Sequence, residues 1–196
     1  MAGAVSQAVF CLAYAWLARR ASWPLAVAGG SVGFALATVV LTGFAPPLAA
    51  LAGLVFLALG LAVPLMPPES RRVELVATPP PSWDLPARMV LATAFVLGLT
   101  ALAGALGPRL TGLLAPFPLY AAILTAFAHA LDGAPAAASV LRGLLLGLVS
   151  FAAFFLVLAA TLHRGIAPAF GLAVVVALTL QGASLYVLRR PARYHS

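Results

Sequence analysis

The sequence predicts an all-α membrane protein, a polytopic bundle of about seven transmembrane helices. Of its 196 residues, 64% are hydrophobic and only 8% are charged, whereas an average soluble domain has about 25% charged residues. Apolar runs of about twenty residues recur along the whole chain, and this is the length that crosses a bilayer as a helix. Strands of a membrane barrel would alternate apolar and polar residues over about ten positions, so helices are favoured.

The first half of the chain, residues 1–66, is expected to form three helices. The first ends at Arg19 and Arg20, and proline pairs beginning at Pro46 and Pro67 end the other two, because proline lacks the N–H that a helix interior needs. The expected helices cover residues 3–18, 24–44 and 48–66.

The second half, residues 87–188, follows a proline-rich loop at residues 67–86 that contains three of the four acidic residues. This loop is the natural boundary between the two halves. Four helices are expected after it, at residues 87–106, 113–131, 136–162 and 166–188, and then a basic tail at residues 189–196.

The basic residues are distributed unequally between the two sides of the predicted membrane. All 11 are arginines, and with seven alternating helices nine fall on one side, whereas only Arg109 and Arg164 fall on the other. Since arginine is enriched in cytoplasmic loops, we expect the loop at 67–86 and the C-terminus in the cytoplasm. A net charge of +7 would suggest nucleic acid as partner of a soluble protein, but these positions indicate the surface of a lipid bilayer instead.

An internal repeat is visible in the chain. Residues 3–24 align without a gap with residues 147–168, and nine of the 22 positions are identical, where about two would be expected by chance in so biased a composition. The match equates the first helix with the sixth, an odd shift, so the two copies would cross the membrane in opposite directions. Inverted repeats of this kind are typical of secondary transporters. The first copy is incomplete, and we expect that two N-terminal helices of a longer ancestor are missing.

Two stretches, GPRLTGLLAPFPLYAAILTAFAH at 107–129 and AVFCLAYAWLARRASWPLA at 8–26, support a resemblance. They are similar to segments of uncharacterised bacterial multi-pass inner-membrane proteins, in which a Gly-Pro-Arg turn leads into a proline-bearing helix and the unit occurs twice. The resemblance implies a permease-like protein of the bacterial inner membrane, and it does not indicate a substrate. The present chain departs from the pattern because it lacks the first Gly-Pro-Arg unit.

The predicted helix at 113–131 carries the main candidate residues. Pro116 and Pro118 would interrupt its first turns and free backbone carbonyls for a ligand, as in the broken helices of transporters; alternatively, they form the turn at which the helix begins. Thr125, His129 and Asp132 follow at spacings of four and three, which places them on one face toward the cytoplasmic end.

Two arginines complete the predicted substrate path. Arg142 is expected to pair with Asp132 across a short loop, where the pair would act as a proton or substrate gate because ionisable groups at membrane depth are costly. The alternative is that both are interfacial anchors whose charged ends reach water. Arg109 is expected at the outer mouth as a ligand for an anion, or else as an ordinary turn residue facing solvent.

Several smaller features bear on packing. The pairs Gly29–Gly33 and Gly143–Gly147 have the spacing of small residues that lets helices approach closely, and Gln181 is expected to hydrogen-bond between helices. Cys11 is the only cysteine, which excludes an internal disulfide and a cysteine-based metal cluster, and we interpret it as a packing residue.

These observations favour a small-solute permease that moves its substrate by rocking one part of the bundle against the other. The alternative is a non-transporting membrane subunit or assembly factor that packs against partner helices, and a homo-oligomer is compatible with either. An enzyme is not expected, because no nucleophile with a base, phosphate-binding loop, metal site or cofactor site is recognisable.

Overall fold

The computed structural model describes residues 2–43, 47–68 and 118–189, with short pieces between 85 and 101. Within these residues all regular structure is helical, as the sequence predicts. A 3₁₀ turn, Leu162–Arg164, joins the last two α-helices, and a further apolar helix is described in part at Leu85–Gly98. The α-helices described without gaps are α1 (Ala2–Leu17), α2 (Trp23–Thr42), α3 (Leu48–Leu65), α5 (Leu119–Asp132), α6 (Ala134–Thr161) and α7 (Ile166–Arg189).

Four of these helices are long and apolar enough to cross a membrane, namely α2, α3, α6 with its 3₁₀ turn, and α7. No more than 28% of any of their spanning windows is buried inside the protein. So much exposed apolar surface is stable only where lipid replaces water as the solvent. The chain is therefore a membrane protein of the helical-bundle type, which confirms the fold class expected from composition. The helices α1, α5 and Leu85–Gly98 are apolar but shorter.

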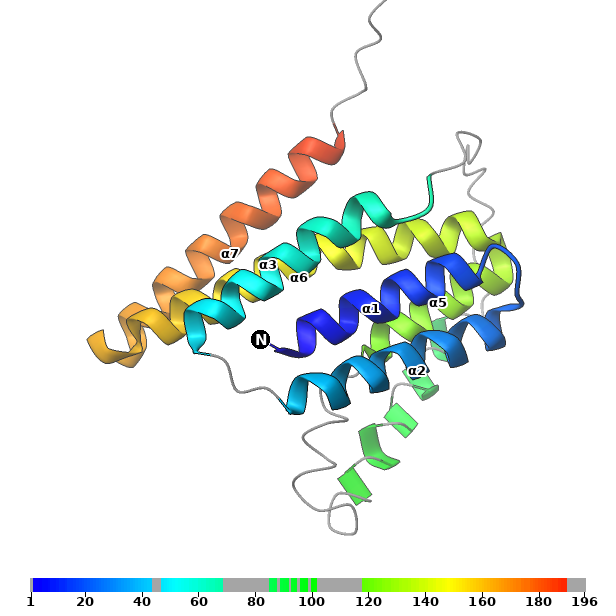
Figure 1. The fold of residues 1–196 in the computed structure, drawn as a ribbon, viewed down its shortest axis with the longest axis horizontal. Helices are drawn as coiled ribbons and strands as arrows, with labels where there is room; N and C mark the ends of the chain where they lie inside the picture. Colours follow the sequence, from blue (N-terminus) through cyan, green and yellow to red (C-terminus); the bar gives the residue numbers. More distant parts are fainter. Residues whose placement is uncertain are drawn as a thin grey trace, which may run out of the picture.

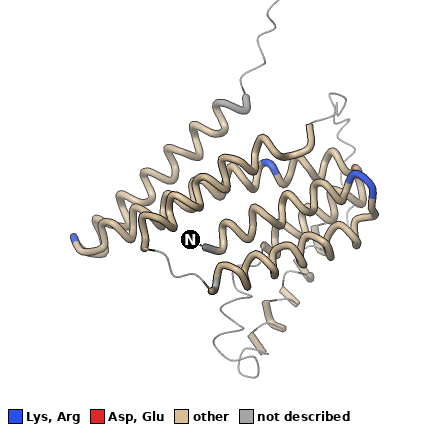
Figure 2. Tube along the Cα trace, viewed as in Figure 1, with Lys and Arg blue, Asp and Glu red and all other residues tan. Residues whose placement is uncertain are grey.

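Within α1–α3 and within α5–α7, successive helices run in alternating directions along the long axis of the bundle (Figure 1). The C-terminal ends of α1, α3, α5 and α7 lie toward one end, and those of α2 and α6 toward the other. Because of this alternation, the turn with Arg19 and Arg20 lies at the same end as the C-terminus of α5, whereas Arg164 lies at the opposite end (Figure 2). The described arginines thus follow the unequal distribution predicted from the sequence.

The packed core lies where α1, α3 and α6 meet one another. Phe10 and Tyr14 of α1, Leu59 of α3, and Leu141 and Leu145 of α6 are all completely buried. Cys11 is also fully buried, in agreement with its predicted packing role. Helix α2 packs on α1 and α5 packs on α6, whereas α7 has α6 as its main neighbour.

The glycines of α2 allow its close approach to α1. A Cβ atom at Gly30 would lie 3.0 Å from the Phe10 ring, and one at Gly33 would lie 3.4 Å from the Ala13 side chain. For Gly29–Gly33 the predicted role in helix approach is therefore confirmed. By contrast, no described atom lies within 4 Å of a Cβ built at Gly143 or Gly147 of α6, so the described helices do not use that pair.

Each of the two helix pairs that begin with a copy of the sequence repeat is joined by a hydrogen bond that involves the equivalent serine. The buried Ser6 of α1 accepts a hydrogen bond from Thr38 of α2 (2.9 Å), and the buried Ser150 of α6 donates one to Gln181 of α7 (3.1 Å). The partners are 32 and 31 residues apart in sequence, and α1 and α6 run in opposite directions (Figure 1). The opposite directions of α1 and α6 are what an inverted repeat requires, whereas Thr38 and Gln181 lie outside the two aligned stretches. The interhelical bond predicted for Gln181 is confirmed.

We expect Gly30→Leu to destabilise the protein because Phe10 is completely buried and its ring cannot move aside. Overpacking of this kind costs about 1–3 kcal/mol of unfolding free energy. The matched control, Gly147→Leu, adds the same side chain where the described residues leave open space, and should be neutral or slightly stabilising. Unfolding of both variants in detergent, followed by far-UV circular dichroism, measures the difference. Equal losses of stability would contradict the α1–α2 packing.

Candidate functional site

A polar contact joins α1 to α5 inside the otherwise apolar bundle. The hydroxyl of Tyr14 lies 3.3 Å from Nδ1 of His129, and the two rings meet edge to face with centroids 6.0 Å apart. Tyr14 is completely buried, whereas His129 is half-buried in the last turn of α5. The contact therefore extends from the core toward the surface at the end of the bundle that contains Arg19 and Arg20.

Thr125 lies one turn before His129 on the same face of α5. Its side chain is completely buried, and its hydroxyl has no hydrogen-bond partner among the residues that the structure describes. The exposed Thr179 and the half-buried Thr161 instead donate to the carbonyl four residues earlier in their own helices, both at 2.7 Å. A buried hydroxyl without a partner costs about 1–3 kcal/mol. Thr125 therefore offers an unused hydrogen-bonding group inside the protein.

The C-terminal end of α3 is held by side chains from two other helices. The indole N–H of Trp16 in α1 donates to the carbonyl of Leu65 at 3.0 Å, and the Arg142 guanidinium of α6 donates to the carbonyl of Pro67. Carbonyls at a helix end have no partner within the helix, and Pro67 and Pro68 supply no N–H groups. Arg19 also stacks over the Trp16 ring, with its guanidinium carbon 5.1 Å from the ring centroid.

The predicted pair between Asp132 and Arg142 is not among the contacts seen for the described residues. Asp132 ends α5 on the exposed surface, and the Arg142 guanidinium donates to the Pro67 carbonyl. The reason is the short connection, in which Gly133 alone separates the helices with φ 84°. Helix α6 starts at Ala134, earlier than expected, so Arg142 lies about 12 Å along its axis. At that depth the guanidinium meets the end of α3 instead.

Pro118 takes the second of its two predicted places, the turn at which the helix begins. It precedes the first residue of α5 as N-cap and accepts a hydrogen bond from the Ala122 N–H at 2.7 Å. Pro118 thus forms the turn at which the helix begins, and does not interrupt it. Pro116 and Arg109 lie outside the described residues, as do residues 113–117 of the predicted helix.

The polar residues form two neighbouring groups that the sequence only partly indicated. Tyr14, Thr125 and His129 lie at the α1–α5 contact, and Trp16 and Arg142 bind the carbonyls at the end of α3; we call these five residues the polar cluster. Sequence reasoning found Thr125, His129 and Arg142 as candidates but not Tyr14 and Trp16. Their signal was present, because a hydroxyl or indole N–H group on a membrane helix requires a partner. The cluster provides a hydroxyl, an imidazole and a guanidinium, which can hold a proton or a small polar or anionic solute.

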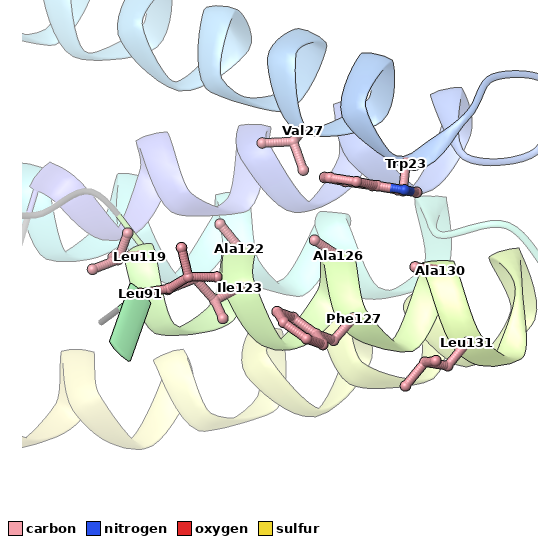
Figure 3. Close-up of a pocket in the computed structure, with 10 residues that line it drawn as sticks. All are labelled: Trp23, Val27, Leu91, Leu119, Ala122, Ile123, Ala126, Phe127, Ala130 and Leu131. Carbon is pink, nitrogen blue, oxygen red and sulfur yellow. The ribbon is translucent and has the colours of Figure 1, made fainter. Parts of the chain in front are cut away.

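An apolar groove is the second feature that could take a ligand (Figure 3). It has a volume of about 460 Å³ and lies between α2 and α5, with one residue from Leu85–Gly98. The lining residues are Trp23, Val27, Leu91, Leu119, Ala122, Ile123, Ala126, Phe127, Ala130 and Leu131. The groove lacks charged residues, so its chemistry differs from that of the polar cluster.

Comparison of the chain with protein-family models, with curated proteins and with solved structures finds no match. Functional inference therefore depends on the geometry of this chain.

We expect Tyr14 and His129 to be coupled energetically. A double-mutant cycle with Tyr14→Phe, His129→Leu and the double variant should give a coupling of about 1 kcal/mol, the usual value of one hydrogen bond. Chemical unfolding in detergent measures it. Tyr120→Phe is the control, since Tyr120 is 72% exposed and should show no coupling to His129. Additive effects of Tyr14→Phe and His129→Leu would show that the contact contributes nothing.

Proposed function

We propose that this chain is a small-solute permease of the bacterial inner membrane and that the polar cluster is the inner gate of its path. The observation that carries the proposal is the buried hydroxyl of Thr125, which lies one turn from the Tyr14–His129 contact and has no hydrogen-bond partner in the described part of the chain. Polar groups inside membrane helices are expensive and are characteristic of substrate and ion pathways. In this position the Thr125 hydroxyl binds the passing solute.

The contacts at the end of α3 close the gate in the present conformation. Trp16 and Arg142 hold α3 against α1 and α6, so the inner end of the path opens when these bonds break. The two serine-linked helix pairs, α1–α2 and α6–α7, move as rigid units against each other, which corresponds to the rocking of inverted repeats in secondary transporters. The excess of arginine supports a cytoplasmic position for the gate and the C-terminus.

Arg109 remains the proposed residue of the outer mouth, and its role comes from the sequence alone. Asp132 is removed from the gate, because it is exposed and the Arg142 guanidinium donates to the Pro67 carbonyl. It serves as an interfacial anchor at the end of α5.

The alternative function, a non-transporting subunit that packs against a partner helix, has one observation in its favour. Gly143 and Gly147 have the spacing of a close helix contact, yet no described side chain would meet a Cβ at either position. This function predicts that Gly147→Leu abolishes co-purification with a partner protein. The permease predicts that the same variant transports normally.

We expect Thr125→Val to reduce solute flux about tenfold, because one hydrogen bond to the solute is lost, without lowering the stability of the protein. Flux is measured in proteoliposomes by light scattering after challenge with polyols, amino acids and small organic anions in turn. The control is Thr179→Val, the same change at an exposed residue whose hydroxyl bonds its own helix. If flux is equal in the two variants for every transported solute, Thr125 is not part of the path.

A second test uses Cys11, the only cysteine and a fully buried one, as a native probe of opening. Arg142→Gln removes the charged donor to Pro67 and should increase the rate of Cys11 labelling by a water-soluble maleimide on the order of tenfold. Arg164→Gln, at the opposite end of the bundle, should leave the rate unchanged. An unchanged rate in Arg142→Gln would remove Arg142 from the gate.

A further inference from the structure

The groove between α2 and α5 has the dimensions of one lipid chain. Its lining residues recur at every turn of α5 from Leu119 to Leu131, a rise of about 18 Å. Half of the hydrocarbon core of a bilayer is about 15 Å thick. The volume of the groove, about 460 Å³, falls within the range of about 300–1,000 Å³ typical of ligand sites. The groove can therefore accept an acyl chain over the depth of one leaflet.

The chemistry of the lining is that of a hydrocarbon site. Ala122, Ala126 and Ala130 form a strip of small side chains on α5, and Trp23 and Val27 of α2 face them across the groove (Figure 3). The adjacent Thr125 is instead buried in the bundle. Helix α5 thus presents a polar group to the interior and an apolar surface to the groove.

Positive charge lies in the turn next to one end of the groove. Trp23 lies at the end formed by Ala130 and Leu131 (Figure 3), and the turn that precedes it contains the exposed Arg19 and Arg20. Tryptophan and arginine are the residues that occupy the level of lipid headgroups. The exposed Asp132 follows Leu131 at the same end, and the two arginines outnumber it. A negatively charged headgroup is therefore attracted to this end.

We propose that the α2–α5 groove binds an anionic phospholipid, with one acyl chain along α5 and the phosphate at Arg19 and Arg20. The phospholipid then fills the space that direct contact between α2 and α5 leaves open and joins these two helices. This inference does not depend on transport, and it applies equally to a non-transporting subunit.

The first test uses the fluorescence of Trp23 in the variant Trp16→Phe/Trp83→Phe, in which it is the only tryptophan. The protein is reconstituted in vesicles that contain either brominated phosphatidylglycerol or brominated phosphatidylcholine. We expect an apparent association with phosphatidylglycerol on the order of tenfold tighter, because each arginine at the surface favours the anionic lipid. Arg19→Gln/Arg20→Gln should abolish this preference, and Ala126→Leu, which narrows the groove, should reduce quenching by both lipids.

The second test keeps all three tryptophans and therefore does not depend on the folding of the Trp variant. Native mass spectrometry of the protein released from equimolar phosphatidylglycerol and phosphatidylcholine should show preferential retention of phosphatidylglycerol. Retention should be lost in Arg19→Gln/Arg20→Gln and kept in the control Arg164→Gln.

Equal quenching of Trp23 by the two lipids would overturn the proposal, and so would a preference for phosphatidylglycerol that persists in Arg19→Gln/Arg20→Gln. Absence of quenching by either lipid would also overturn it. If the Trp23 fluorescence then changes with the protein-to-lipid ratio, a helix of a second copy occupies the groove.

Discussion

The carbonyl groups at the C-terminal end of α3 impose the constraint on which the arrangement of this bundle depends. A carbonyl without a partner in a bilayer costs several kcal/mol, and the prolines that follow α3 supply no N–H groups. Trp16 and Arg142 satisfy two of these carbonyls from two different helices. The hydrogen bonds therefore tie α1, α3 and α6 together at one end, and the apolar core of Phe10, Leu59 and Leu141 fills the space between them.

The same requirement explains the place of the polar side chains elsewhere in the bundle. Ser6 with Thr38, and Ser150 with Gln181, pair across neighbouring helices because neither partner has water available. The Thr125 hydroxyl differs from these groups, since it is buried and has no partner among the described residues. A departure from the usual pairing of buried polar groups is where a function is expected, and the Tyr14–His129 contact lies one turn away.

The candidate site was only partly predictable. A spacing of four residues correctly placed Thr125 and His129 on one face of α5, because helical geometry relates positions within one element. The expected pairing of Asp132 with Arg142 depended on where α6 begins. A start two residues earlier than expected, after the single Gly133, places Arg142 about half a turn deeper in α6, where its guanidinium contacts the Pro67 carbonyl. Tyr14 and Trp16 were missed because their partners are 115 and 49 residues away in sequence.

The sequence by itself determined the membrane environment, the helical class and the limits of most helices within a few residues. These properties follow from the length of apolar runs and from the position of proline, which act locally along the chain. Only the tertiary structure decided which polar groups find partners, that Gly29 and Gly33 but not Gly143 and Gly147 meet a neighbouring helix, and that α2 and α5 leave a groove between them. Contacts between helices depend on how each helix is rotated about its axis and how deep it lies in the membrane. Because an apolar residue in lipid is equally stable on any face of a helix, composition carries no information about these contacts.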